Sequence, residues 1–348
     1  MAGLSLFIAS EANAQCAGAS PTDGVPDSAA IQACLDSGTE VRLEPGHPGY
    51  IIDAKIRFRS DDRLLTSTGP SKAKLVAHAW LAEPMLEVQD ANDYEISELI
   101  FDGNKGSRGR YDLCNDDFRP EGNNLLVSGN GFVIHHLDVI NAMCGTGMQV
   151  TGSNFQIYSI YFAWNGYSSK PGASQPWADG LTLTRCDGGY VHSNNFVDNT
   201  DVDLMAGNGI GCVVQANTIT HVGAYGFAGI HVGQEGSRAG STLAYNSVNA
   251  NYNTLAFGII VGPHPWRDFE WTPDVGVVRD NSSNGAVVNV AVDGIQAGAV
   301  YSNAATNAQG NDGWGGCTLA ADYTAGDFGS AYVAPGYIWR TYHGGGCQ

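Results

Sequence analysis

An internal repeat constrains the fold of this chain more than any other feature of its sequence. One phrase places an asparagine between apolar residues, as in Val191-His-Ser-Asn194-Asn-Phe196, and it recurs at intervals of 22 to 35 residues. Its asparagines are Asn194, Asn217, Asn246, Asn281 and Asn303. The alternation of apolar and polar residues around them indicates short strands. Strands at such intervals predict a solenoid whose coils stack ~4.8 Å apart, with asparagines bonded from coil to coil at one turn.

A second phrase, Gly-apolar-x-apolar, interleaves with the first. It begins at Gly147, Gly180, Gly229 and Gly258, and two copies without the glycine occur at 202–204 and 288–290. Each repeat therefore contains at least two strands. A β-propeller is disfavoured because its blades need about 40–45 residues, and the consensus of a leucine-rich repeat is absent.

The start of the chain supplies a resemblance. The segments Asp27-Ser28-Ala29-Ala30-Ile31-Gln32-Ala33-Cys34 and Val41-Arg42-Leu43-Glu44-Pro45-Gly46 are similar to the first coil of pectin-lyase-like proteins. This resemblance covers about residues 20–310 and implies an all-β fold, a right-handed single-stranded parallel β-helix with a short N-terminal capping helix. In that helix Ile31 and Cys34 would face the first coil, with Asp27 or Ser28 as N-cap.

We divide the chain into three parts. Residues 1–14 resemble the remnant of a signal peptide, 15–310 form the β-helix with its cap, and 311–348 form a C-terminal cap or lid. Eight cysteines fit a secreted, extracellular or periplasmic protein, and we predict nearest-neighbour disulfides. The predicted pairs are Cys16–Cys34, Cys114–Cys144, Cys186–Cys212 and Cys317–Cys347.

The charge balance narrows the classes of partner. The chain has 35 acidic and 17 basic residues, a formal net charge of −18, which disfavours nucleic acid and polyanionic substrates. No apolar run approaches the ~20 residues of a membrane span, so we expect no membrane partner. The expected partner is a poly- or oligosaccharide, and the sequence leaves the oligomeric state open.

Carboxylates gather where we align the second phrase across coils. That alignment predicts an outward column of side chains, namely Gln149, Thr182, Asp203, His231, Ile260 and Asn289. Asp201 lies two residues before Asp203 and Asp179 lies one coil earlier, so we predict Asp179, Asp201, Asp203 and His231 as catalytic groups. Four histidines belong to the first phrase and are interpreted as structural or exposed, namely His135, His136, His192 and His221.

Two insertions, 165–178 and 262–275, flank this patch and carry tryptophans whose rings can stack on sugars. The predicted substrate-binding residues are Trp177, Arg185, Glu235, His264, Trp266 and Trp271. The patch and its walls predict a groove for a glycan.

Paired carboxylates favour glycoside hydrolysis, in which one acts as acid and the other as base or nucleophile. Two alternatives stay open: a Ca²⁺-dependent polysaccharide lyase or uronate C5-epimerase, and a non-catalytic glycan-binding or adhesin β-helix. We predict no metal and no cofactor for the hydrolase, whereas a lyase could hold Ca²⁺ at the acidic run 198–203 and use Arg185 as base. A polygalacturonase mechanism is disfavoured, because Asn199-Thr200-Asp201 is not followed by that family's Gly-His-Gly or Arg-Ile-Lys.

Overall fold

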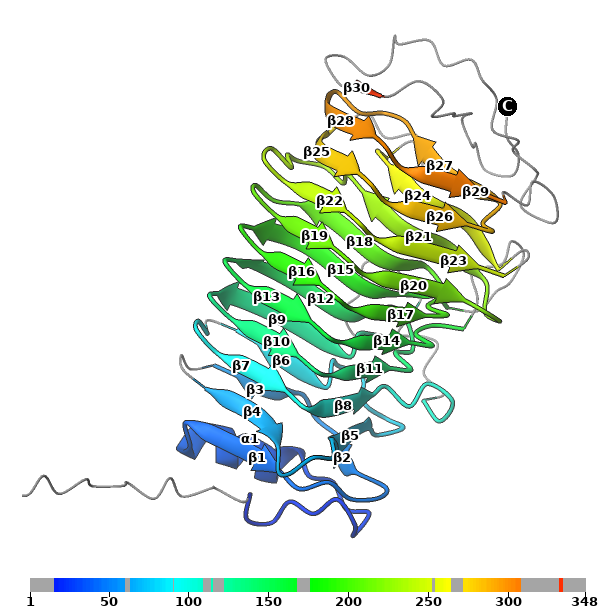
Figure 1. Cartoon of the computed structure of the whole chain (residues 1–348). Coiled ribbons are helices and arrows are strands. Elements are labelled where there is room, and N and C mark those ends of the chain that lie inside the picture. The colour runs from blue at the N-terminus through cyan, green and yellow to red at the C-terminus, as the bar shows by residue number, and fades with distance from the viewer. Residues whose placement is uncertain are drawn as a thin grey trace, which may run out of the picture.

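The chain winds into a stack of coils, each contributing one strand to each of three parallel sheets (Figure 1). This computed structural model describes residues 16–59, 63–89, 91–108, 114, 122–167, 176–251, 254–263, 272–307 and 332–333. Consecutive strands of a coil enter sheets A, B and C in turn, and every paired strand is parallel to its neighbour. The predicted parallel β-helix is therefore confirmed.

The strands of sheets A and B are mostly short, and those of sheet C are mostly longer from β9 onward. Sheet A contains β1 (Glu40–Leu43), β4 (Leu64–Ser67), β7 (Glu95–Ser97), β10 (Val133–His135), β13 (Gln156–Tyr158), β16 (Tyr190–His192), β19 (Val213–Gln215), β22 (Thr242–Ala244), β25 (Asp274–Arg279), β28 (Ala297–Tyr301) and β30 (Tyr332–Val333). Sheet B contains β2 (Tyr50–Ile52), β5 (Ala73–Ala77), β8 (Leu99–Asp102), β11 (Asp138–Ile140), β14 (Tyr161–Ala163), β17 (Asn195–Val197), β20 (Thr218–His221), β23 (Ser247–Ala250), β26 (Ser282–Asn284) and β29 (Ala304–Thr306). Sheet C contains β3 (Ile56–Phe58), β6 (Leu86–Val88), β9 (Leu125–Asn130), β12 (Gly145–Ser153), β15 (Ala178–Asp187), β18 (Val202–Asn208), β21 (Gly226–Val232), β24 (Leu255–Val261) and β27 (Val288–Val292).

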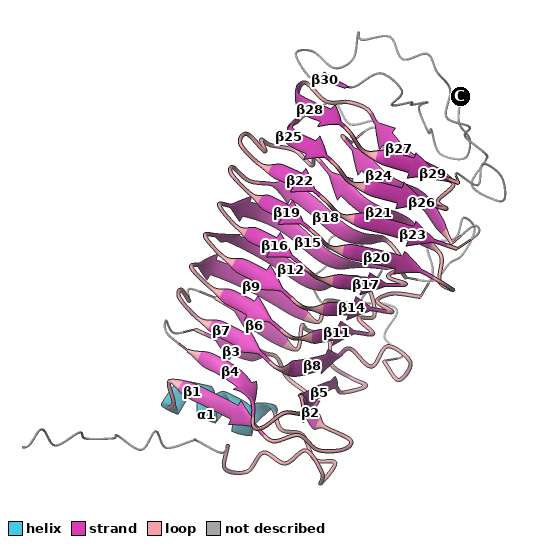
Figure 2. Ribbon diagram, viewed as in Figure 1, coloured by secondary structure: helices cyan, strands magenta, loops and turns pink. Residues whose placement is uncertain are grey.

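The N-terminal end is capped by α1 (Ser28–Ser37), coloured cyan in Figure 2. As predicted, Ile31 and Cys34 are buried against the first coil and Asp27 is the N-cap. The carboxylate of Asp27 makes no cap bond to the helix; it accepts instead from the backbone N–H groups of Ser20 and Ile51, each at 2.8 Å. Asp27 thus fastens the cap to the solenoid, although burial raises the pKa of its carboxyl group.

The predicted asparagine ladder runs through the turn between sheets A and B. The Nδ2 of Asn194 donates to Oδ1 of Asn217 at 3.0 Å, and Asn217 donates likewise to Asn246 at 2.9 Å. The same bond continues to Asn281 and Asn303. The residue before each asparagine has a positive φ, for example 54° at Ala216, which makes the corner sharp enough to turn each asparagine inward.

Removing the middle of this ladder should weaken the fold. We expect Asn217→Ala to lower the free energy of unfolding by about 2–3 kcal/mol, since it deprives buried donors of Asn194 of their acceptor. Asn249→Ala is the matched control, because Asn249 is exposed on the neighbouring strand β23 and should change stability by under ~0.5 kcal/mol. Denaturant unfolding of both variants tests this. Equal midpoints would show that the asparagine ladder does not contribute to stability.

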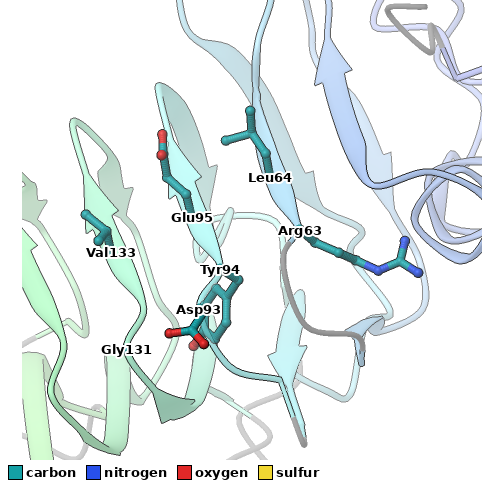
Figure 3. Close-up of a pocket in the computed structure, with 7 residues that line it drawn as sticks. All are labelled: Arg63, Leu64, Asp93, Tyr94, Glu95, Gly131 and Val133. Carbon is teal, nitrogen blue, oxygen red and sulfur yellow. The ribbon is translucent and has the colours of Figure 1, made fainter. Parts of the chain in front are cut away.

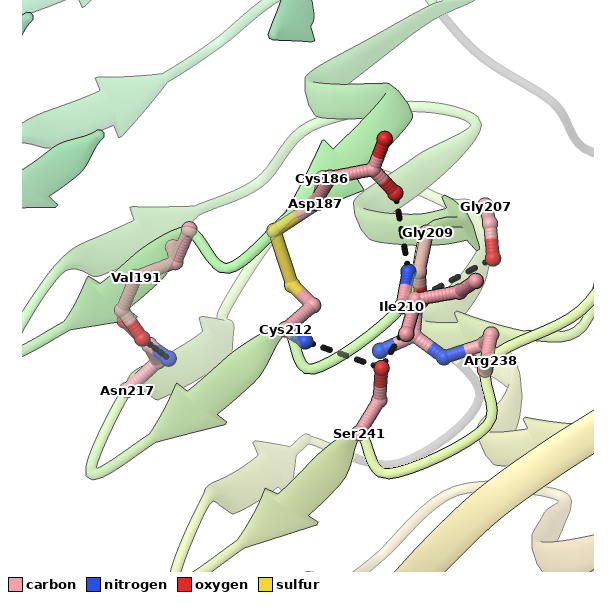
Figure 4. Close-up of a disulfide and its surroundings, with 10 residues drawn as sticks. All are labelled: Cys186, Asp187, Val191, Gly207, Gly209, Ile210, Cys212, Asn217, Arg238 and Ser241. Atoms are coloured by element: carbon pink, nitrogen blue, oxygen red, sulfur yellow. Dashed lines mark hydrogen bonds between the residues drawn. A yellow bond between two sulfur atoms is a disulfide. The ribbon is translucent and has the colours of Figure 1, made fainter. Parts of the chain in front are cut away.

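Three of the four predicted disulfides are confirmed: Cys16–Cys34, Cys114–Cys144 and Cys186–Cys212. The fourth, Cys317–Cys347, lies outside the described residues, as do the N-terminal segment 1–14 and nearly all of 311–348. Figure 4 shows Cys186 joined to Cys212 of the next coil, beside Asp187, which accepts from the backbone N–H of Ile210. This disulfide staples two successive coils where sheet C turns into sheet A.

Candidate functional site

The outer face of sheet C carries the predicted column, with two changes. The strand register aligns Gln149, Thr182, Met205, His231, Ile260 and Ala291. Gln149, Thr182, His231 and Ile260 are therefore placed as expected. The expectation was wrong for Asp203 and Asn289, whose places in the column belong to Met205 and Ala291.

The error arises at the glycine of the second phrase. A Cβ on Gly180 would lie 2.6 Å from the carbonyl oxygen of Asp203 and 2.9 Å from the Phe196 ring, so that position points into the solenoid. The pairing of Leu181 with Leu204 gives Asp203 the equivalent position in its own coil. Asp203 is accordingly fully buried, with 0% exposure, and belongs to the interior.

Asp203 ends a second interior polar ladder, at the turn between sheets B and C. Asn165 donates to Asn199 at 2.7 Å, and Asn199 donates to Oδ1 of Asp203 at 2.8 Å. The other carboxylate oxygen, Oδ2, accepts from Nε2 of His221 at 2.6 Å. Burial lowers the pKa of His221, but attraction to and hydrogen bonding with Asp203 outweigh it, so the net pKa is raised.

Asp179 is the predicted catalytic residue that lies on the outer face. One oxygen of its carboxyl group, Oδ2, accepts from the Thr182 hydroxyl at 2.6 Å, and Oδ1 accepts from the backbone N–H of Val202 at 2.9 Å. The residue keeps partial contact with solvent. Loss of hydration is nevertheless the main cause that raises its pKa to about 7, while these two hydrogen bonds lower it and Asp203 adds a smaller rise.

Asp201 lies on the coil next to Asp179 and is partly exposed. Its backbone N–H donates to Ala178 at 3.1 Å, and its carbonyl accepts from Phe227 and Ala228. Asp201 immediately precedes β18, and its backbone is bonded to the residue before Asp179. The two predicted residues therefore lie on neighbouring coils at the turn between sheets B and C.

The surroundings of Asp179 on the N-terminal side are polar. Gln149 accepts from Asn123 at 3.1 Å and donates to Thr184 at 3.2 Å. Trp177, the predicted sugar-stacking residue, is 42% exposed two residues before Asp179. It forms an isolated bridge to Gly166 that closes the base of the first insertion. An exposed indole and amide side chains therefore flank the carboxyl group.

The outer face becomes apolar from β18 onward. The residues in line with Asp179 on successive strands are Val202, Ala228, Phe257 and Val288, and they cluster with the residues in line with Thr182. All of them are buried. His231 is also fully buried, its Nε2 bonds to the carbonyl of Gly262 at 3.0 Å, and burial lowers its pKa to about 4. The expected open position of His231 is therefore wrong.

The remaining predicted binding residues do not converge on Asp179. Arg185 is exposed and paired with Asp187, and it lies six residues along β15, roughly 20 Å from Asp179. Glu235 is exposed beyond the end of β21. The predicted residues His264, Trp266 and Trp271 lie outside the described residues.

The acidic run 198–203 uses its buried carboxylates for bonds within the chain. Asp198 accepts from the backbone N–H groups of Val222 and Gly223, at 2.8 and 3.2 Å, and Asp203 accepts from Asn199 and His221. Across the described ranges, the clustered metal-type ligand atoms are those of Glu98, His135 and His136, which lie elsewhere. Ca²⁺ at 198–203 stays a prediction.

Lys105 is a residue that sequence reasoning missed. Burial lowers its pKa to about 8, and its Nζ donates to the carbonyls of Trp164 and Gly166. It also lies 5.4 Å from the centre of the Tyr167 ring. Lys105 therefore joins the loop that follows β8 to the base of the first insertion. A single lysine among glycines carries no pattern that could have revealed this contact.

An open depression lies where β4, β7 and β10 of sheet A begin, on coils nearer the N-terminus than the coil of Asp179. Figure 3 shows its lining: Arg63, Leu64, Asp93, Tyr94, Glu95, Gly131 and Val133. It contains none of the predicted catalytic residues. The Asp179 region combines a carboxyl group of raised pKa with an exposed tryptophan and is therefore the candidate site.

Comparison with known proteins identifies the architecture. The tailspike protein of E. coli bacteriophage HK620, solved in complex with a pentasaccharide, matches with a TM-score of 0.56 and 11% identity, over 90% of this chain and 61% of that chain. The Dettilon tailspike protein matches with a TM-score of 0.53 and 14% identity, over 90% of this chain and 66% of that chain. The chain is a right-handed parallel β-helix protein.

The similarity covers only part of the tailspike chain. This β-helix chain spans about three fifths of the HK620 tailspike chain. An alginate lyase from Paenibacillus matches with a TM-score of 0.46 and 10% identity, over 91% of this chain and 97% of that chain. No family model and no curated protein matches the sequence. No helix in the described part of the β-helix is long and apolar enough to cross a membrane.

Proposed function

We propose that this protein is a secreted glycoside hydrolase that cleaves a neutral or weakly charged polysaccharide on the outer face of sheet C. The observation that carries the proposal is Asp179, whose pKa is raised to about 7 on a partly exposed face. A general acid must hold its proton at working pH, and a carboxyl group with this pKa does so in a large fraction of molecules. Asp179 is therefore the acid that protonates the leaving glycosidic oxygen.

Asp201 is the proposed second carboxylate. Glycoside hydrolysis needs an ionised partner, which either activates water or attacks the sugar itself. Asp201 is partly exposed on the adjoining coil, whereas Asp203 is enclosed with His221 in the interior. We therefore assign the base or nucleophile to Asp201 and give Asp203 and His231 no contact with substrate.

Three observations support a glycan as the partner. The exposed ring of Trp177 offers a flat apolar surface for a sugar, and Gln149 and Thr182 offer hydrogen-bonding groups beside it. The net charge of −18 disfavours a polyanion. The HK620 tailspike, whose fold this chain shares, was solved with a pentasaccharide.

The disulfides fit an oxidising, extracellular or periplasmic location.

Hydrolysis is better supported than β-elimination. A lyase must neutralise a uronate carboxylate and abstract the neighbouring proton with a base. Arg185, the candidate base, is paired with Asp187 at the far end of β15, and the oxygens of Asp198 and Asp203 accept from donors of the chain. The proposed hydrolase works through the carboxyl groups of Asp179 and Asp201, a mechanism that uses no metal.

A panel of neutral and uronic polysaccharides, with and without chelator, tests the proposal. We expect new reducing ends without the ultraviolet absorbance of unsaturated uronates, and no effect of chelator. Ultraviolet absorbance that chelator removes would overturn the hydrolase in favour of a Ca²⁺-dependent lyase. Binding to a glycan that is never cleaved would overturn it in favour of an adhesin.

A further inference from the structure

Two histidines and two glutamates meet on the outer face of sheet A, away from the Asp179 region. Nδ1 of His135 lies 2.6 Å from Nδ1 of His136, and Nδ1 of His136 lies 3.8 Å from Oε1 of Glu98. Nitrogen or oxygen atoms from Glu98, His135 and His136 all lie within 4.8 Å of one another. The fourth residue, Glu95, accepts from Nε2 of His135 at 3.2 Å.

The backbone brings these residues together. Glu98 and His136 occupy the same turn position on successive coils, with φ values of 54° and 52°. The strands before them pair Ser97 with His135, so the turn residues Glu98 and His136 stack on each other. On the next coil, the Tyr158 ring stacks on His135 with an interplanar angle of 9° and a centroid distance of 5.0 Å. The His135 ring is therefore held in a fixed orientation.

The hydrogen-bond pattern leaves His135 ready to bind a cation. Glu95 accepts from Nε2–H of His135, which leaves Nδ1 of a neutral His135 with a lone pair. That lone pair faces Nδ1 of His136 at 2.6 Å, so it can accept a hydrogen bond from Nδ1–H of His136 or, once that proton leaves, join His136 in binding a cation. A carboxylate that receives the distal N–H of a histidine is the usual outer partner of a metal-binding imidazole, because it fixes the tautomer and raises the basicity.

We propose that Glu98, His135 and His136 bind one divalent transition-metal ion of the zinc class, with Glu95 positioning His135. Tetrahedral Zn²⁺ with bonds of ~2.0–2.1 Å holds its ligand atoms ~3.3 Å apart. The distances of 2.6 and 3.8 Å bracket that separation, so small side-chain rotations suffice. Two imidazoles and one carboxylate suit Zn²⁺, whereas Ca²⁺ and Mg²⁺ prefer six or more oxygen ligands.

The ion would link two coils that are far apart in sequence. Glu98 follows β7, whereas His135 ends β10 of the next coil and His136 follows it. Because the ion binds the folded arrangement, it should raise thermal stability in proportion to the logarithm of its concentration. The imidazole of His136 is about half exposed, which leaves the fourth ligand position to water.

Calorimetric titration of the tag-free full chain with Zn²⁺ alone tests the site. We expect one ion per chain, and we expect Co²⁺ to give the intense visible absorbance of tetrahedral coordination. His136→Asn should weaken binding at least tenfold. Asparagine is chosen because it tolerates the positive φ of this position. Glu95→Gln should weaken it about 10–100-fold although Glu95 donates no ligand atom.

His192→Ala is the matched control, since His192 stacks on the other side of Tyr158 in the same column and is no ligand. It should bind Zn²⁺ as the wild type does. A wild-type chain without one-to-one binding at tens of micromolar Zn²⁺ would overturn the proposal. Wild-type affinity in folded His136→Asn would overturn it as well.

Discussion

Asp179→Asn is expected to lower kcat by about 10²–10⁴-fold, the usual contribution of a general acid. The amide has nearly the same shape, can still accept from the N–H of Val202, and lets the Thr182 hydroxyl turn to accept from its NH₂ group. It has no proton to give to a leaving oxygen. Reducing ends released at saturating substrate measure kcat, and glycan affinity measured separately should be unchanged.

Asp187→Asn is the matched control for this variant. Asp187 lies on the same strand β15 and the substitution removes the same charge. Its carboxylate, however, forms an ion pair with Arg185 and accepts from the N–H of Ile210. It should leave kcat unchanged. If Asp179→Asn retained more than a tenth of the wild-type kcat, Asp179 would not be the acid.

The pH dependence follows from the raised pKa of Asp179. Wild-type activity should fall as pH rises through about 7, because the acid then loses its proton.

The raised pKa of Asp179 also makes the free energy of unfolding depend on pH. The folded-state pKa of about 7 lies above the ordinary aspartate value of 3.8, so unfolding releases a proton between these values and stability falls as pH rises across that window. Asp179→Asn, which cannot ionise, should therefore melt at a higher temperature than the wild type at pH 8.

Much of this architecture could be predicted because the repeat has a direct physical cause. Asparagine at a fixed corner, as at Asn194 and Asn217, bonds to its counterpart above and below, so periodic asparagines predict stacked coils. Ile31 and Cys34 lie on one face of a capping helix, and nearest-neighbour cysteines such as Cys186 and Cys212 meet because successive coils are adjacent. These features depend on spacing, which a sequence displays.

The candidate site depends on side-chain direction, which the sequence displays less well. Strict alternation turns Asp203 outward, but Asp203 and its neighbour Leu204 both face the interior, as Gly180 and Leu181 do on the preceding coil. The apolar character of the outer face beyond β18 could not be predicted either, because Val202 and Met205 suit an interior position as well as an exterior one. The convergence of Glu98 with His135 and His136 depends on a strand register that spacing alone does not fix.

The pair formed by Asp203 and His221 is expected to be the most costly to break. Asp203→Ala should lower the free energy of unfolding by about 3–5 kcal/mol, because it leaves the buried His221 without its charged partner and Asn199 without one acceptor. Asp138→Ala is the control: Asp138 pairs with Lys72 at 2.6 Å on a partly exposed face, and its loss should cost at most ~1 kcal/mol.

The pH dependence separates this ion pair from simple packing. The folded-state pKa of His221 is raised above its ordinary value, so its stabilising contribution is complete below pH ~6.5 and is lost as pH rises through the raised pKa. Denaturant unfolding at pH 6 and pH 9 should therefore show a larger loss for Asp203→Ala at pH 6. An equal loss at both pH values would mean that Asp203 only fills space.

Folded Asp203→Asn should keep its kcat, with the alkaline limb of activity moved to lower pH, because the Asp203 charge is one of the causes that raise the pKa of Asp179.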